Sequence, residues 1–68
     1  MNDDVRKQLE GEVEGLELQL REVKAESEFV RKGLSAANTD GYGLLHDLRQ
    51  KQERLEKQIQ ALRAALAA

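Results

Sequence analysis

The sequence has no cysteine and no proline, and among its 68 residues it has one histidine, one phenylalanine and one tyrosine. Without cysteine the chain cannot form a disulfide bridge or a thiolate metal site. A lone histidine, His46, lacks the partner that metal binding or acid–base catalysis requires. No glycine-rich phosphate loop follows a strand pattern. We therefore expect no metal, no cofactor and no enzymatic activity.

Long hydrophobic runs are also absent. No segment approaches the roughly 20 apolar residues that span a bilayer. The first residues, Met1-Asn2-Asp3-Asp4, are acidic, unlike those of a secretory signal. The sequence therefore predicts a cytoplasmic protein without a membrane-spanning segment.

The small size of the chain limits the core that it can build. A domain of this length seldom gains more than about 3–5 kcal/mol from its core unless a disulfide, a metal or oligomerisation supports it. Charged residues make up 35% and hydrophobic residues 40% of the sequence, a composition typical of long helices and coiled coils. Oligomerisation is the remaining source of stability.

The hydrophobic residues that are present follow a heptad rhythm in each half of the chain. Such residues lie along one side of a helix and need a partner helix to bury them. We call the line of such residues in each half of the chain a stripe. One polar residue interrupts each stripe, Ser27 in the first and Gln52 in the second. The first stripe is Leu9, Val13, Leu16, Leu20, Val23, Ser27, Val30, Leu34 and Ala37, and the second is Leu45, Leu48, Gln52, Leu55, Ile59, Leu62 and Leu66.

A short segment rich in glycine and small polar residues, Asn38-Thr39-Asp40-Gly41-Tyr42-Gly43, separates the stripes. Such a cluster favours a turn over one continuous helix. We expect an all-α fold of one domain over residues 1–68. It is an antiparallel helical hairpin, with a helix over about 3–37, a turn over about 38–41 and a helix over about 42–67. Asn38 is a candidate cap for the first helix, and Thr39 or Asp40 for the second.

The charged residues that flank the stripes give an independent estimate of the register. In an antiparallel pair, Glu17 faces Arg63 and Lys24 faces Glu56, and both pairs are centred on position 40, within the glycine-rich segment. Glu26 and Lys51 form a third pair of opposite sign at nearly the same register. In this register Ser27 and Gln52 lie almost opposite each other, as polar residues that specify a register do.

A second face of the first helix carries small and apolar residues outside the stripe. Glycine inside a helix is costly unless another chain segment approaches closely. We expect this face to pack against a second hairpin and form a dimeric four-helix bundle. A docking surface for another protein and a small-molecule pocket are the alternatives. The dimer-packing candidates are Gly11, Gly15, Leu18, Ala25, Ala61 and Ala65; Ala36 continues the same face.

Large side chains outside both stripes are the candidates for binding another protein: Leu18, Phe29 and Tyr42. Tyr42 has a second interpretation, as a cap over the end of the core. Nucleic acid is an unlikely partner, because residues 1–28 carry nine acids against four bases, and the seven bases of residues 29–68 are interleaved with four acids.

The sequence thus predicts a small protein–protein interaction module that acts as an adaptor, or as an inhibitor or anti-activator, through helical surfaces. A structural oligomerisation element of a larger assembly or parent protein is one alternative. A nucleic-acid-associated regulator is the other.

Overall fold

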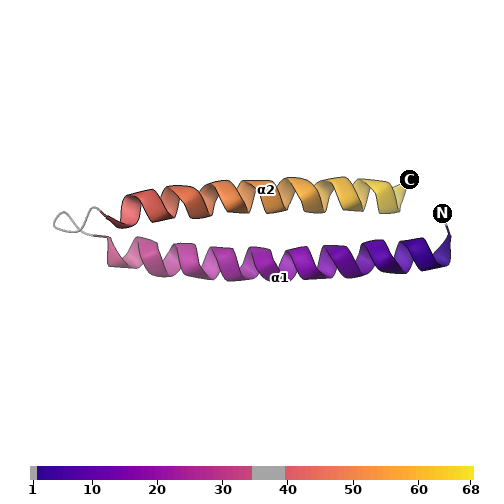
Figure 1. Ribbon diagram of the computed structural model, residues 1–68, viewed down its shortest axis with the longest axis horizontal. Helices are drawn as coiled ribbons and strands as arrows, with labels where there is room; N and C mark the ends of the chain where they lie inside the picture. Colours follow the sequence, from indigo (N-terminus) through magenta and orange to yellow (C-terminus); the bar gives the residue numbers. More distant parts are fainter. Residues whose placement is uncertain (1, 35–39) are drawn as a thin grey trace.

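The computed structural model describes residues 2–34 and 40–68, which form two long helices. Helix α1 spans Asp3–Gly33 and α2 spans Gly41–Ala67. The helices lie side by side and antiparallel, in a rod of 55 × 14 × 12 Å (Figure 1). The chain is therefore a helical hairpin, and the alternative of one continuous helix is wrong.

The start of α1 is fixed by a side-chain cap. The amide of Asp4 donates a hydrogen bond to Oδ1 of Asn2 at 2.9 Å, which satisfies a free N–H of the first turn. The carboxylates of Asp3 and Asp4 lie at the positive end of the helix dipole. These interactions define where the helix begins.

The end of α1 differs from the expected boundary near Ala37. The helix ends at Gly33, and Leu34 is extended, with its amide donating to the carbonyl of Arg31 at 3.2 Å. Glycine is a poor helix former, which accounts for an early end. The expected helical residues 35–37 and the proposed caps Asn38 and Thr39 lie outside the described residues.

Helix α2 begins at Gly41, where the two helices come close together. A Cβ atom at Gly41 would lie 2.6 Å from Cδ2 of Leu34 and 3.5 Å from Cγ1 of Val30, so the missing side chain makes room for α1. The side chain of Asp40 makes no capping hydrogen bond, contrary to one of the two expectations for this end.

The two heptad stripes form the seam between the helices. Every stripe residue that the structure describes is buried or half-buried. The best-buried side chains cluster around Val23, Leu48 and Leu55, with Leu16, Leu20 and Val30 packed against them. No described side chain is fully buried, because two helices in one layer shield each residue from two sides only.

The predicted register is confirmed at one of its charged pairs. The guanidinium of Arg63 forms an ion pair with the carboxylate of Glu17 across the seam. Among residues 2–34 and 40–68, the other predicted pairs, Lys24–Glu56 and Glu26–Lys51, are not ion pairs. Glu56 instead accepts a hydrogen bond of 3.2 Å from the amide of Gln52 on its own helix.

Candidate interaction surface

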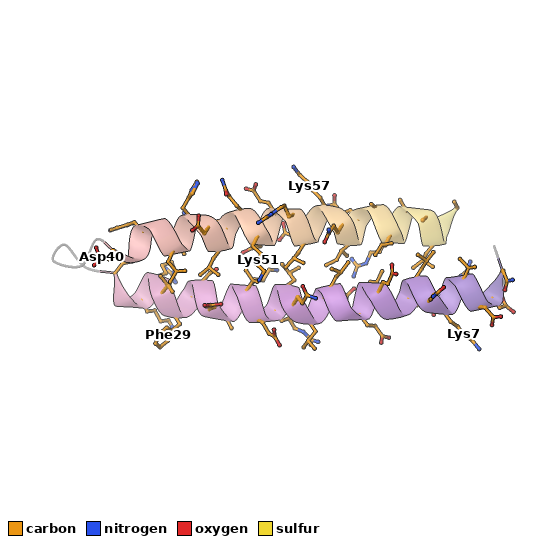
Figure 2. The ribbon with its side chains drawn as sticks, viewed as in Figure 1. Lys7, Phe29, Asp40, Lys51 and Lys57 are labelled. Carbon is orange, nitrogen blue, oxygen red and sulfur yellow. The ribbon has the colours of Figure 1, made fainter. Side chains whose placement is uncertain are left out.

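The most exposed large hydrophobic side chain of the described residues lies on the side of α1 that faces away from α2. Figure 2 shows Phe29 and Lys7 projecting from this side. Phe29 is 80% exposed. Leu18 precedes it by eleven residues, or about three helical turns, so it lies on the same side, and it is 51% exposed. We call this side, with Gly11, Leu18, Ala25 and Phe29, the outer face.

The outer face also carries two small residues, Gly11 and Ala25. A Cβ atom at Gly11 would meet no heavy atom within 4 Å, and Ala25 is exposed. The close approach that would explain a glycine here is therefore not made by the described part of the chain itself. The same holds for Gly15, which lies toward the edge of this face.

The predicted dimer-packing residues separate into two locations. Gly11, Leu18 and Ala25 belong to the outer face, directly opposite the seam. Gly15 and Ala61 instead line a groove where α1 and α2 flank each other, and Ala65 follows Ala61 by about one turn along α2. The sequence pattern suggests one continuous surface, but these residues belong to different sides of the hairpin.

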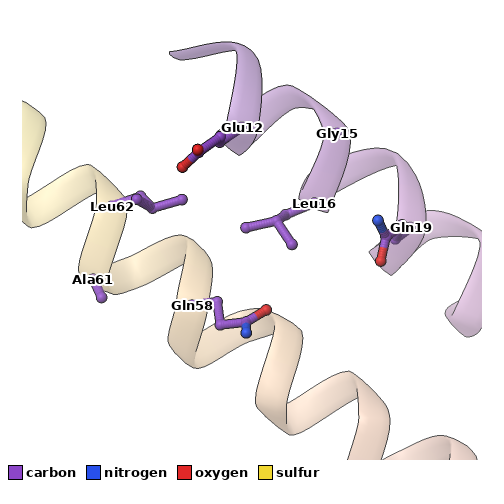
Figure 3. A pocket seen from close by; sticks show the side chains of 7 residues that line it. All are labelled: Glu12, Gly15, Leu16, Gln19, Gln58, Ala61 and Leu62. Carbon is purple, nitrogen blue, oxygen red and sulfur yellow. The ribbon is translucent and has the colours of Figure 1, made fainter. Parts of the chain in front are cut away.

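The groove has a volume of about 570 Å³ and lies toward the end of the rod that is far from the turn (Figure 3). Leu16 and Leu62 form its apolar floor, and Gln19 and Gln58 lie at one end. Small side chains leave the space open at Gly15 and Ala61. We call this site the end groove; it is lined by Glu12, Gly15, Leu16, Gln19, Gln58, Ala61 and Leu62.

Two more hydrophobic side chains are exposed at the start of α2. Tyr42 is 54% exposed and Leu44 is 47% exposed. Sequence reasoning identified Tyr42 but missed Leu44. The signal was the pair Leu44-Leu45, of which the seam can bury only one member. Leu45 is that member, so Leu44 is left in solvent.

Ser27 and Gln52 are the polar residues of the seam, and only Gln52 has a side-chain hydrogen bond among the described residues. Oγ of Ser27 is buried and has no hydrogen-bond partner among the described residues. Gln52, its expected neighbour, is half-buried and directs its amide to Glu56 instead. A buried hydroxyl without a partner lowers stability. Ser27 is therefore a weak point of the seam.

Two pairs of polar side chains on the surface join residues of the same helix. Arg31 binds the carboxylate of Glu28 on the preceding turn, and this hydrogen bond lowers the pKa of Glu28. The same hydrogen bond raises the pKa of Arg31. His46 lies 3.1 Å from the amide nitrogen of Gln50, measured from Nε2. Both pairs are exposed and link residues within one helix.

The described residues bring no group of three or more histidine or carboxylate side chains together as a candidate metal site. In the same ranges, no helix is long and apolar enough to cross a membrane. The features that remain are surfaces: the outer face, the end groove and the exposed start of α2. Comparisons of the chain with protein-family models, with curated proteins and with solved structures find no match.

Proposed function

We propose that this chain is a protein–protein interaction module that works through its exposed helical faces, as an adaptor or as an inhibitor that occludes a helix or groove of its partner. The observation that carries this proposal is the outer face of α1, where Phe29 and Leu18 are exposed on one side of the helix. Large apolar and aromatic groups dominate the energetics of protein interfaces.

Self-association is part of the proposal. The seam leaves every described side chain partly accessible, and Val5 near the start of α1 is also exposed. A second hairpin would cover part of this apolar surface and form an assembly of four helices, supplying stability that a single seam lacks. The surface that the second copy leaves free is then available to another protein.

Sedimentation equilibrium and affinity capture test this function together. At micromolar concentration we expect a mass of about twice the 7.7 kDa of one chain. With the protein immobilised, we expect a defined partner that is released when Tyr42 is replaced by alanine, whereas alanine at Leu18 or Phe29 should weaken either partner capture or dimerisation, which sedimentation distinguishes. The matched control is Gln50→Ala, an exposed position on α2. A folded monomer that captures nothing specifically would contradict the proposal.

The cytoplasmic location expected from the sequence remains a prediction. Fractionation of cells that produce a tagged chain would test it, and recovery in the membrane or secreted fraction would contradict it.

A further inference from the structure

We infer that a second copy of this chain covers the outer face of α1, so that the two α1 helices pack antiparallel with Leu18 on the two-fold axis. This inference rests on the proposed self-association and adds its interface, direction and register. It concerns α1 alone, because the outer face lies opposite the seam that α2 already occupies.

The sizes of the side chains on the outer face are complementary in this register. In an antiparallel pair centred on residue 18, positions equidistant from that residue face each other. Gly11 lies seven residues before it and Ala25 lies seven after it, so a glycine meets an alanine twice. Small residues at these points allow close approach of the two backbones. The open space at Gly11 is thus filled by the second helix.

Phe29, the most exposed large hydrophobic side chain described, also finds a counterpart. Lys7 lies eleven residues before Leu18 and Phe29 lies eleven after it, and Figure 2 shows both on the side away from α2. The pairing therefore places the lysine of one copy over the phenylalanine of the other. The lysine stem covers the ring, and its ammonium group is attracted to the face of the ring.

The charges along one edge of the outer face select the same arrangement. Glu14 lies four residues before Leu18 and Arg21 lies three after it on the same edge, so they face each other to within one residue. Asp3 and Lys32 are related in the same way. In residues 2–34 and 40–68, none of these four side chains takes part in an ion pair. Glu22, four residues after Leu18, lies on the other edge of the face and does not meet Glu14.

A parallel pair of α1 helices would lose these contacts. Its two-fold axis turns each edge of the outer face toward the opposite edge of the second copy, so Glu14 would no longer face Arg21, and the two Lys7 side chains would lie at one level instead of each facing Phe29. The antiparallel pair instead forms each favourable contact twice, as a self-complementary two-fold interface does. Charge and size thus favour one direction and one register.

The geometry of the outer face changes the form of the four-helix assembly. In a square bundle, two hairpins meet through their flanks, which here means the end groove. Contact through the outer face gives a row in which the two α1 helices are central and the two α2 helices are peripheral. The end groove and the start of α2 then stay accessible to a partner.

Cross-linking tests the two-fold axis directly, because the sequence has no cysteine of its own. Directly facing Cα atoms of closely packed helices come within disulfide range, about 4.4–6.8 Å. Leu18→Cys should form an interchain disulfide under mild oxidation. Ala61→Cys is the matched control in the end groove and should stay largely reduced. Cross-linking of the second variant without the first would overturn the inference in favour of a square bundle.

Charge exchange tests the register. Glu14→Arg places like charges together twice and should weaken dimerisation by about tenfold or more, judged from the usual strength of exposed pairs. Arg21→Glu should do the same, and the double variant Glu14→Arg/Arg21→Glu should restore dimerisation. Glu53→Arg, the same change at an exposed position of α2, should have little effect.

The results separate this inference from the proposed function. A wild-type chain that sediments as a monomer overturns this inference and the proposed self-association, whereas binding of another protein is judged separately by affinity capture. A wild-type dimer that is insensitive to Glu14→Arg retains self-association and overturns the register. Helical content measured on each variant by circular dichroism shows that the hairpin itself stays folded, since Glu14, Leu18 and Arg21 are all exposed.

Discussion

The guanidinium group of Arg63 binds the carboxylate of Glu17, which lies 46 residues earlier in the sequence and on the other helix. This contact defines the register of the hairpin, that is, which residues of α2 lie beside which residues of α1. The side chain of Arg63 is exposed and that of Glu17 is half-buried, so solvent screens the pair, and it defines the register more than it stabilises the hairpin.

Removing this pair should therefore lower the free energy of unfolding only slightly. A double-mutant cycle with Glu17→Ala and Arg63→Ala, measured by urea denaturation, should give a coupling energy of about 0.2–1 kcal/mol. The exchange Glu17→Arg/Arg63→Glu should keep most of the stability. A coupling above about 2 kcal/mol would show that the pair is far less solvated than its exposure indicates.

Enlarging Gly41 should reveal how closely the helices approach. We expect Gly41→Val to lower the free energy of unfolding by about 1–3 kcal/mol, because its side chain would overlap Leu34. Gly43→Ala is the control, since nothing lies within 4 Å of its Cβ position. It should raise stability by up to about 1 kcal/mol through helix propensity. Equal effects at both positions would contradict the close approach.

Replacing the buried hydroxyl of Ser27 should stabilise the hairpin. Ser27→Ala removes a polar group that has no hydrogen-bond partner in the described structure, at almost no cost in packing. The midpoint of thermal unfolding should rise, by an amount that corresponds to about 1 kcal/mol or less. A fall in the midpoint would mean that the hydroxyl is hydrogen-bonded in solution.

Phe29→Ala should separate binding from folding. Because Phe29 is exposed, the unfolding free energy of the single hairpin should change by no more than about 0.5 kcal/mol. Association through the outer face should weaken by about 1 kcal/mol or more. Leu48→Ala, in the seam, is the opposite case and should lower hairpin stability by about 2 kcal/mol or more. Strong unfolding of the phenylalanine variant would place Phe29 in the core instead.

The pair of Glu28 and Arg31 predicts a dependence of stability on acid. Its hydrogen bond lowers the pKa of Glu28 below the ordinary value of 4.5, so the pair stabilises the helix above that pH. The contribution is lost as the pH falls below 4.5 and through the lowered pKa of the folded state. Glu28→Gln should reduce the loss of helicity in this range, as followed by circular dichroism. The control is the Glu22→Gln variant, whose loss of helicity with acid should match that of the wild-type chain.

The sequence determines the seam well and the surfaces less well. Heptad spacing depends only on helical geometry, which explains why residues such as Val23 and Leu55 lie where the pattern places them. The Glu17–Arg63 pair follows from the same geometry. By contrast, the small and apolar residues Gly15 and Leu18 suggest a single surface, although they lie about 60° apart around the helix. With the seam facing α2, Leu18 lies opposite it and Gly15 lies on the flank, where it lines the end groove.

Two features depend on packing detail. Leu34 has good helical spacing, yet its backbone is extended, because the chain leaves the helix at Gly33. In the register that the Glu17–Arg63 pair defines, Ser27 and Gln52 fall at nearly the same level, yet the amide of Gln52 donates to Glu56, four residues along its own helix. A sequence pattern places residues in a layer but does not choose among the hydrogen bonds available there.

The close contact of Gly41 with Leu34 has a consequence for the order of folding. Six residues separate Leu34 from Gly41 in the sequence, whereas the contact of Glu17 with Arg63 encloses most of the chain. Closing the longer loop first would cost about 1–2 kcal/mol more in chain entropy. Once Leu34 and Gly41 are together, each layer of the seam brings the next within reach. We therefore expect pairing of the helices to begin next to Leu34 and Gly41 and to proceed toward the chain ends, so that few long-range contacts have to form by random search.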